Sequence, residues 1–386
     1  MKKILIVAST FPRWAGDTEP RFILDYAKAI AQYYNVTILV PSAPQAKDHE
    51  YIEGIEVIRY RYFPVRSLET LCYPGAIIAR IKSNKLRVLL VPFLIIGLYK
   101  KLLSLSQQYD IIHAHWLIPQ GILTSFVKTP FIVTGHGTDV TSLNTGLIKK
   151  LKARCLRKAD NIVMVSNSLA LKIKETYPKI IKPIHVISMG CDTTAFSPKN
   201  RVQNFWKQDG KKIVLFVGRL VEIKGLSFLI DAMNYVDALL IIVGSGPLEI
   251  ALKEQANPLK DKVRFLGPKT HEELKTIYAS ADIFVAPSIT AANGATEGFG
   301  LVLIEAMASG LPVIASHSGG IVDIVKNGEN GLLTEEKNIK HLAYNIQLLL
   351  TDTTLYKRLS TNAVLTAKAY DYSEIAKKYK SIIDNA

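Results

Sequence analysis

The sequence predicts an α/β protein in which two doubly wound, Rossmann-like domains hold parallel sheets that face each other across an interdomain cleft. Short apolar strands alternate with helical patterns through most of the 386 residues, which is typical of parallel α/β layers. The alternation restarts after residue 212, and the length suits two or three domains of about 150 residues each. We expect residues 1–195 and 196–367 to form the two domains, and residues 368–386 to form a helix that crosses back to the first.

The expected strands come in two sets, separated by a segment rich in small and turn-forming residues, Met189–Asn200, which we interpret as a hinge. The strands of the first set are Ile4–Ala8, Val36–Val40, Val57–Tyr60, Ile111–Ala114, Phe131–Thr134 and Ile162–Val165. Those of the second set are Ile213–Val217, Leu239–Val243, Val263–Leu266, Ile283–Ala286 and Val313–Ala315. Helical periodicity marks Arg21–Tyr33, Leu147–Arg157 and Ser373–Asp384. In such sheets, ligands bind beyond the carboxyl ends of the strands.

Composition excludes several classes of protein. Hydrophobic residues make up 48% of the chain and charged residues 21%, which excludes a disordered or fibrous protein. Three cysteines lie far apart without a CxxC pair, which argues against a disulfide scaffold or a zinc cluster and fits a reducing compartment. The apolar run in MKKILIVAST is too short for a signal peptide, so we expect a cytoplasmic protein. The net charge of +15 suits a polyanionic small substrate or an anionic membrane, and no nucleic-acid-binding motif accompanies it.

A diphosphate site is indicated where the second set of strands begins. The strand Ile213–Val217 runs directly into Gly218, Arg219 and Lys224, and a helix follows. Helix N-termini attract anions, and arginine and lysine bring a planar fork and a mobile point charge to phosphate. Two solvated surface cations at a β–α turn are the alternative.

Two other loops that contain glycine follow strands. Leu239–Val243 ends at Gly244 and Gly246, which could let the backbone approach a base or a phosphate, although a GxG that stands by itself is more often an ordinary tight turn. The long loop Thr10–Pro20 follows the first strand, and its Gly16 could bring the backbone to a phosphate.

The strongest local signal is EGFGLVLIEAMASG, which begins at Glu297. A helix that starts near Gly300 would offer the backbone N–H groups of residues 299–302 to an anion. Glu305, about one and a half turns inside that helix, could accept hydrogen bonds from a sugar diol. The alternatives are a buried ion pair for Glu305 and a solvated loop acid for Glu297.

Histidines gather at strand ends in the first half. His136 lies between two glycines after Phe131–Thr134, where it could bind a substrate or stabilise charge. His113 and His115 lie on one face of the preceding strand, but no third ligand has a recognisable spacing, so we expect no metal site.

Val88–Tyr99 is an uncharged, mostly apolar run that lies between basic residues, Lys82, Lys85, Arg87, Lys100 and Lys101. It is shorter than the roughly 20 residues needed to span a bilayer. A basic-flanked apolar helix can lie in the interface of an anionic membrane, which would make the protein peripheral on the inner face of the cell membrane. Pro92 and Gly97 weaken a regular helix, and a core helix of the first domain is an equal alternative.

Taken together, these motifs resemble glycosyltransferase family 4, whose members are retaining enzymes with the two-domain GT-B fold. The resemblance covers essentially the full length and rests on motifs in the family's order, FPRWAGD, DIIHAHW, VTGHGTD, MGCDTTAF, GRLVEIKG, GSGP and EGFGLVLIEAMASGLPVIAS. It implies that the C-terminal domain binds a nucleotide-diphosphate sugar and that the N-terminal domain binds the acceptor. It implies no metal and no other cofactor.

The resemblance also implies roles for single residues. Arg219 and Lys224 match the diphosphate-binding pair, Glu305 the carboxylate at the ribose hydroxyls, and Glu297 the acid near the donor sugar's hydroxyls. His136 matches the histidine that contacts the donor sugar. The residues expected in catalysis are His136, Arg219, Lys224 and Glu297. Those expected to bind the donor are Gly16, Gly218, Gly244, Gly246, Phe299, Gly300, Leu301, Val302 and Glu305.

The implied reaction moves a hexosyl group from a UDP- or GDP-linked sugar to a hydroxyl of a glycan or polyprenyl-linked acceptor, in polysaccharide biosynthesis of the cell envelope. The hydroxyl would attack from the face that the diphosphate leaves, and the leaving phosphate would take its proton, so the anomeric configuration is retained. The chain has no Asp-x-Asp motif, which disfavours a metal-dependent site of the usual single-domain kind. A nucleotide-sugar epimerase and a non-catalytic sugar-nucleotide-binding protein are the alternatives. An oxidoreductase is disfavoured because the fingerprint glycines are missing after the first strand.

Overall fold

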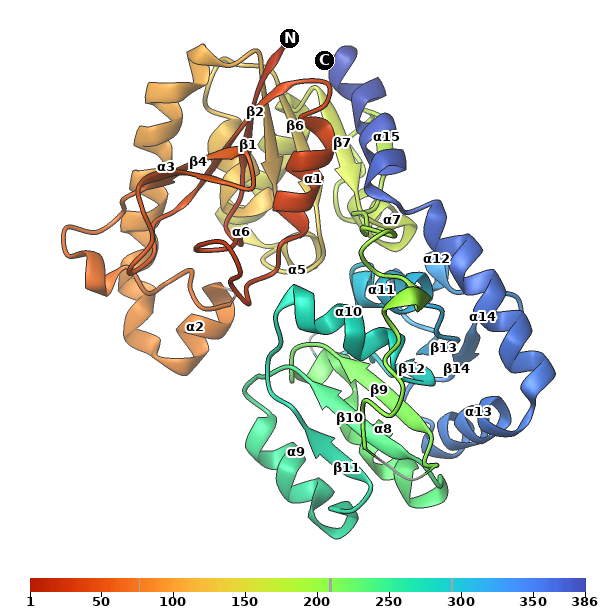
Figure 1. Cartoon of the computed structure of the whole chain (residues 1–386). Helices are drawn as coiled ribbons and strands as arrows, with labels where there is room; N and C mark the ends of the chain where they lie inside the picture. The colour runs from red at the N-terminus through yellow and green to blue at the C-terminus, as the bar shows by residue number, and fades with distance from the viewer. Residues whose placement is uncertain (76, 208–209, 293) are drawn as a thin grey trace. The chain divides into compact units, whose positions relative to one another are not determined.

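The computed structural model describes residues 1–75, 77–207, 210–292 and 294–386. These residues form two compact units, which we call unit 1, Met1–Met189 with Tyr372–Ala386, and unit 2, Gly190–Asp371. Each unit is a sheet of mainly parallel strands covered by helices (Figure 1). The prediction of two parallel α/β domains is confirmed.

Unit 1 is built on an eight-stranded sheet in the order β3-β4-β2-β1-β5-β6-β7-β8, as far as the structure describes it. The strands are β1 (Lys3–Val7), β2 (Asn35–Pro41), β3 (His49–Ile52), β4 (Ile55–Tyr60), β5 (Ile111–His115), β6 (Phe131–Gly135), β7 (Asn161–Met164) and β8 (Ile184–Val186). Neighbouring strands pair in parallel except β3 and β4, which form an antiparallel hairpin. The central strands β5 and β6 are buried along their whole length, which explains why most of their residues are apolar.

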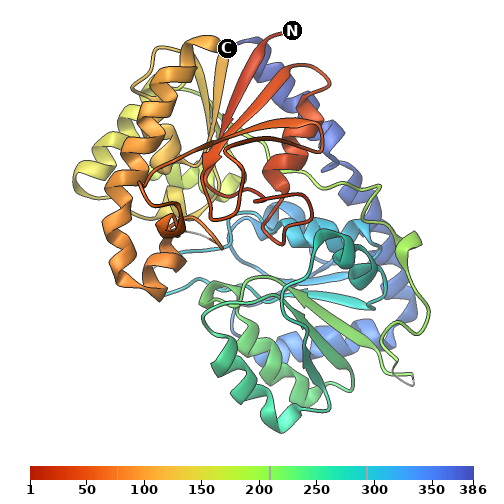
Figure 2. The ribbon, with the colours of Figure 1, turned by 60° about the vertical axis from the view of Figure 1, so that its left-hand side comes forward.

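Helices cover both faces of this sheet. They are α1 (Phe22–Ile30), α2 (Ile77–Ser83), α3 (Val91–Leu105), α4 (Ile122–Thr124), α5 (Thr138–Thr141), α6 (Gly146–Lys158), α7 (Asn167–Thr176) and α15 (Tyr372–Asp384). In Figures 1 and 2, α3 lies on one side of the sheet, and α1 and α15 lie together on the other.

The C-terminal helix α15 completes the core of unit 1. The ring of Tyr379 lies 4.8 Å from that of Tyr26 on α1. At the end of α15, Asp384 accepts a hydrogen bond of 2.6 Å from the hydroxyl of Tyr34. Residues at the two ends of the sequence therefore share one core.

Unit 2 holds a six-stranded sheet in the order β11-β10-β9-β12-β13-β14, and its described pairings are all parallel. The strands are β9 (Ile213–Val217), β10 (Leu239–Val243), β11 (Val263–Phe265), β12 (Ile283–Ala286), β13 (Val313–Ser316) and β14 (Leu332–Thr334). The helices are α8 (Leu226–Ala232), α9 (Glu249–Ala256), α10 (His271–Ala279), α11 (Leu301–Ala308), α12 (Ile321–Ile324), α13 (Ile339–Thr351) and α14 (Thr353–Lys368). The strand order reverses between β9 and β12, which creates a topological switch point at their carboxyl ends.

The predicted strands all occur, with ends that shift by two residues at most, but three strands at or next to the sheet edges were missed. These are β3, β8 and β14, which are three or four residues long and partly exposed. Such strands lack the long apolar run on which the prediction relied. The β3–β4 hairpin turns at Glu53 and Gly54, which both have positive φ, a turn geometry that matches the twist of two antiparallel strands.

The apolar segment of the first half is longer than the sequence suggested. A 3₁₀ turn, Lys85–Leu90, runs into α3, so that Lys85–Gln108 forms a helical stretch of 24 residues. Pro92 does not interrupt α3, because it occupies the first turn, where a helix tolerates proline. The expectation that the segment is too short for a bilayer, which used Val88–Tyr99 alone, is therefore wrong on length.

Candidate functional site

Most of the predicted site residues lie at the switch point of unit 2. Gly218, Arg219 and Lys224 follow β9, and Glu297 lies in the loop after β12. Because β9 and β12 are adjacent and parallel, both loops start at the same side of the sheet, where the carboxyl ends of the strands lie. Ligands bind at these carboxyl ends in open α/β sheets.

Lys224 and Glu297 form an ion pair at these carboxyl ends. Lys224 Nζ donates a hydrogen bond of 2.5 Å to Glu297 Oε2, and both side chains are 16% exposed. Burial alone would raise the pKa of the Glu297 carboxyl, but the charge of Lys224, its hydrogen bond and the charge of Arg219 hold that pKa below its usual value. Glu297 is therefore an ionised hydrogen-bond acceptor next to two cations.

A glycine brings the two loops together. Gly225 has φ of +60°, and a Cβ atom built there would lie 1.9 Å from the carbonyl oxygen of Pro287. The amide of Ile289 donates a 2.8 Å hydrogen bond to the carbonyl of Ile223 beside this contact. Only glycine allows this backbone approach, which places Lys224 within reach of the loop after β12.

Gly244 and Gly246 serve a similar packing purpose. A Cβ atom on Gly244 would lie 2.0 Å from the carbonyl oxygen of Gly218, and one on Gly246 would lie 2.4 Å from that of Leu220. The loop after β10 thus packs against the loop that carries Arg219, so these two glycines support the shape of the candidate site. Whether their backbone also touches a ligand stays a prediction.

The start of α11 borders the same site. Gly300 precedes the helix with φ of +100°, a conformation that favours glycine. A small cavity is lined by Lys224, Ser288, Glu297, Gly300 and Val302, among others. Phe299 is buried and its ring lies 5.7 Å from that of Tyr370, while Leu301 is partly exposed. The structure therefore places the helix start beside the ion pair.

Glu305 lies in α11 and is bound from a neighbouring helix. The hydroxyl of Tyr278 on α10 donates a hydrogen bond of 2.9 Å to Glu305 Oε2. Burial and the charge of Glu305 raise the pKa of Tyr278 well above its ordinary value, so the phenol stays a donor. This contact fixes the orientation of a partly exposed carboxylate.

In unit 1, His136 follows β6 and hydrogen bonds to a second histidine. His136 Nε2 lies 3.0 Å from His115 Nδ1, and the rings of Trp116 and Phe22 pack around His136 at 4.8 and 5.7 Å. Burial lowers the pKa of His136 to about 3. Burial, together with the two neighbouring histidines, lowers the pKa of His115 as well. Both rings are therefore neutral at pH 7.

Asp139 holds the turn that carries His136. Its Oδ1 accepts hydrogen bonds from the amides of His136 and Gly137, and its Oδ2 accepts one from the amide of Leu117. Three N–H donors compensate a buried carboxylate. This aspartate belongs to the motif GHGTD, and sequence reasoning did not assign it a role.

His113 uses both ring nitrogens inside the protein. Its Nδ1 lies 2.8 Å from the hydroxyl of Tyr26, and its Nε2 lies 2.8 Å from Thr134 Oγ1. Neither nitrogen is left for a metal ion. No group of three histidine, cysteine, aspartate or glutamate side chains suited to a metal occurs among the described residues.

Gly16 lies in a compact turn after β1. Asp17 anchors this turn through hydrogen bonds from the amide and guanidinium of Arg13, at 2.7 to 2.8 Å. Gly16 itself is exposed, has φ of +80°, and has no atom within 4 Å of its Cβ position. It lies in unit 1 like His136, whereas the other predicted site residues lie in unit 2.

Sequence reasoning missed three residues that the structure adds to these clusters. Ser288 donates to Glu297 Oε2 at 3.4 Å, Tyr278 binds Glu305, and His115 binds His136. A lone serine after β12 and a tyrosine on another helix carry no motif. The pairing of His115 was within reach, because parallel strands β5 and β6 end at the same edge.

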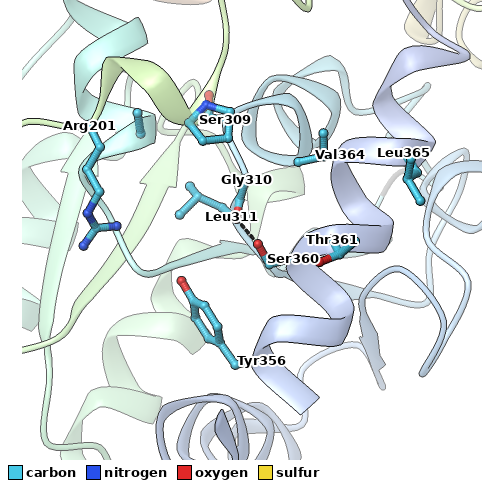
Figure 3. Close-up of a pocket in the computed structure, with 11 residues that line it drawn as sticks. Arg201, Ser309, Gly310, Leu311, Tyr356, Ser360, Thr361, Val364 and Leu365 are labelled. Carbon is cyan, nitrogen blue, oxygen red and sulfur yellow. Dashed lines mark hydrogen bonds between the residues drawn. The ribbon is translucent and has the colours of Figure 1, made fainter. Parts of the chain in front are cut away.

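A groove of about 450 Å³ lies in unit 2 at the amino end of β13, away from the carboxyl ends that carry the candidate site (Figure 3). Gly310 and Leu311 precede β13 and line the groove together with Tyr356 and Ser360 of α14, and Ser360 Oγ donates to the Gly310 carbonyl at 2.6 Å. None of the predicted site residues lines it. The groove is therefore separate from the candidate site.

Comparison with known proteins agrees with this geometry. The family described as Glycosyltransferase Family 4 matches residues 20–195, and the one described as Glycosyl transferases group 1 matches residues 198–365. An uncharacterised glycosyltransferase of Methanocaldococcus jannaschii is 30% identical over 294 residues, which are 70% of this chain and 74% of that protein.

Solved structures share the fold over the whole chain. Sucrose-phosphate synthase from Thermosynechococcus elongatus has a TM-score of 0.80 and 23% identity, over 100% of this chain and 99% of that one. HepE of Anabaena in complex with UDP-glucose has a TM-score of 0.75 and 20% identity, over 100% of both chains. The two family matches fall in order on the two halves of the chain, and the Methanocaldococcus jannaschii relative is 30% identical across both halves. The chain therefore belongs to glycosyltransferase family 4 and has the GT-B fold.

Proposed function

We propose that this glycosyltransferase moves a hexosyl group from a nucleotide-diphosphate sugar to a hydroxyl of a glycan or polyprenyl-linked acceptor, with retention of configuration and without a metal. The observation that carries the proposal is the cluster of Arg219, Lys224 and Glu297 at the switch point of unit 2. UDP is the favoured nucleotide, since HepE of Anabaena binds UDP-glucose on a similar fold.

The charges of the cluster suit a diphosphate. Glu297 holds Lys224 from one side, and the exposed Arg219 adds a second positive charge. A diphosphate at this site would gain charge-assisted hydrogen bonds from both cations, and the start of α11 would add N–H donors. Glu297, kept ionised by the same cations, accepts hydrogen bonds from the donor sugar's hydroxyls.

Glu305 is proposed to bind the ribose. A carboxylate accepts from two adjacent hydroxyls, and Tyr278 already holds one oxygen of Glu305 in place. Such prior orientation lowers the entropy that binding costs.

In the reaction, the bond between the anomeric carbon and the β-phosphate oxygen breaks, and a bond forms between that carbon and the acceptor oxygen. The acceptor's proton passes to the departing diphosphate on the same face. Arg219 and Lys224 stabilise the negative charge that develops on the leaving oxygen. Stabilisation of developing charge by fixed groups is usually the largest single contribution to enzymatic rate enhancement.

His136 is proposed to contact the donor sugar as a neutral hydrogen-bonding group. An unpaired buried N–H is rarer than an unpaired acceptor, and His115 Nε2 is buried without a hydrogen-bond partner among the described residues. This favours the proton on His115 Nδ1, which donates to His136 Nε2. His136 then carries its own proton on Nδ1 and can donate it to a sugar oxygen.

A donor screen tests the proposal. The purified protein is heated with UDP-, GDP- and ADP-sugars in the presence of EDTA, and a ligand at 100 times its dissociation constant should add about 2.7 kcal/mol of stability. The donor that binds is then incubated with glycan and polyprenyl-phosphate acceptors. A glycosylated product with the donor's anomeric configuration is expected, whereas an isomerised free nucleotide sugar would identify an epimerase. Failure of every donor to shift the transition would overturn the proposed site.

A further inference from the structure

The helical stretch Lys85–Gln108 is apolar on its outer face as well as on its core face. Leu94, Leu98 and Leu102 of α3 are buried against unit 1. Other large apolar side chains of this stretch are 38% to 73% exposed, as is Ile78 of the preceding helix α2. They are Leu86, Val88, Leu89, Phe93, Ile95, Ile96 and Leu103. Only 17% of its most apolar 18-residue window is buried, so this is not the core helix that the sequence left open.

The charge around this face has one sign. Between Thr70 and Tyr109 the sequence contains six basic residues and no acidic one. Lys82, Lys85 and Lys100 are exposed and make no ion pair with any described residue. Two arginines are fixed instead: Arg87 donates to the carbonyl of Arg80 at 3.0 Å, and Arg80 donates to that of Thr70 at 3.1 Å.

One side of the segment is fixed to the domain. A Cβ atom on Gly97 would lie 2.8 Å from the carbonyl oxygen of Arg61, so α3 packs closely on the residues that follow β4. Lys100 and Lys101 end the apolar run inside the helical stretch. A helix held in this way cannot place its whole circumference in lipid, although 24 residues would suffice to cross a bilayer.

We propose that residues 77–108 dock unit 1 onto an anionic lipid bilayer, with the outer apolar face of the 3₁₀ turn and α3 in the interface and the lysines at the headgroups. An amphipathic helix binds an interface in this way, through buried apolar area and attraction to anionic lipid. In both views, α3 lies along the outside of unit 1, on the face of the sheet away from α1 and α15 (Figures 1 and 2). The inference rests on these residues and not on the proposed reaction.

Flotation of the full-length protein with vesicles tests the proposal. We expect binding to vesicles of 70% phosphatidylcholine and 30% phosphatidylglycerol in 50 mM NaCl, and weaker binding to pure phosphatidylcholine or in 500 mM NaCl. The double variant Leu89→Ser/Ile96→Ser should lower the partition coefficient at least about tenfold, since it removes two apolar side chains from the interface. The triple variant Lys82→Gln/Lys85→Gln/Lys100→Gln should weaken binding to anionic vesicles and flatten the salt dependence.

A matched control replaces two exposed leucines elsewhere in unit 1, Leu147 and Leu171. The variant Leu147→Ser/Leu171→Ser should float like the unchanged protein, and all variants should unfold at similar temperatures because the replaced side chains are exposed. No flotation at 50 mM NaCl, or equal flotation of Leu89→Ser/Ile96→Ser, would overturn the proposal. The proposal would also be overturned if the unchanged protein formed a dimer that does not bind vesicles and Leu89→Ser/Ile96→Ser were a monomer. The apolar face would then bind a second copy of the chain.

Discussion

His115 Nδ1 and His136 Nε2 lie 3.0 Å apart at the carboxyl ends of two adjacent strands, β5 and β6. A hydrogen bond between two neutral imidazoles requires one ring to donate and the other to accept. The tautomers of His115 and His136 are therefore coupled, and the rings of Trp116 and Phe22 pack against His136.

Loss of this bond should slow turnover without removing donor binding. We expect His115→Leu to lower kcat about tenfold to a hundredfold, because small misplacements of a positioned group cost that much, while the dissociation constant for the donor changes little. His115→Asn, whose amide can replace Nδ1, should recover part of the rate. Nitrogen-15 NMR of His136 should report the Nδ1–H tautomer in the unchanged protein and a mixture in His115→Leu. An unchanged kcat in His115→Leu would contradict the positioning role, and His49→Asn at an exposed histidine serves as control.

Stability should fall as the pH falls from 6.5 to 5. Burial lowers the pKa of His113 to about 3 and lowers that of His115 below its ordinary value. In this window the unfolded chain binds protons at both residues and the folded chain does not, so acid favours unfolding. Each histidine that is protonated only in the unfolded chain adds up to about 1.4 kcal/mol per pH unit to the slope of the unfolding free energy against pH.

Urea unfolding at pH 5.0, 5.75 and 6.5 measures this dependence. The variant His113→Gln should have a smaller slope of unfolding free energy against pH than the unchanged protein. Its lower absolute stability does not affect the comparison. A stability that is flat or rises towards pH 5 would show that the folded protein protonates these rings.

The two cations of unit 2 should be essential for turnover. Arg219→Ala and Lys224→Ala should each lower kcat/KM by about two orders of magnitude, because one lost contact to a developing oxyanion costs about 3 kcal/mol. Lys253→Ala, at an exposed lysine paired with Glu249, should leave the rate unchanged. Near-normal turnover in both site variants, measured as release of nucleoside diphosphate, would show that Arg219 and Lys224 do not bind the diphosphate.

Gly225 should tolerate no side chain. Gly225→Ala would combine a positive φ with a Cβ atom only 1.9 Å from the carbonyl oxygen of Pro287, and we expect it to destabilise unit 2 by more than about 2 kcal/mol. Gly328→Ala is the matched control, because Gly328 also has positive φ but has nothing within 4 Å of its Cβ position. The excess loss in Gly225→Ala, measured by urea unfolding, isolates the loop contact. Equal losses would mean that the loop after β12 moves freely away.

The sequence predicted the part of the fold that depends on local pattern. Strands buried on both faces, such as β9 and β12, are continuous apolar runs and were located to the residue. Strands β3, β8 and β14 form by pairing with a longer neighbour, and that pairing is a tertiary contact that no local pattern records.

In the candidate site, too, local motifs predicted which loops carry the residues, whereas the contacts between the residues depend on tertiary packing. Motifs placed Lys224 and Glu297 in loops at one sheet edge, but their ion pair joins residues 73 positions apart and depends on the backbone approach at Gly225. Ser288 and Tyr278 reach the site through packing alone. Likewise, the apolar character of Val88–Tyr99 was visible in the sequence, but only the packed structure shows which side of α3 unit 1 covers.

The position of α15 has a consequence for how the chain is made. Thr134 in β6 and Tyr379 in α15 are hydrogen-bond partners separated by 245 positions, and the Tyr379 ring also lies 5.2 Å from that of His113. During synthesis from the N-terminus, the whole of residues 190–371 leaves the ribosome before this tyrosine does. The contacts of Tyr379 with Thr134 and His113 can therefore form only after the whole of unit 2 has been synthesised, so the core of unit 1 is completed later than its own strands.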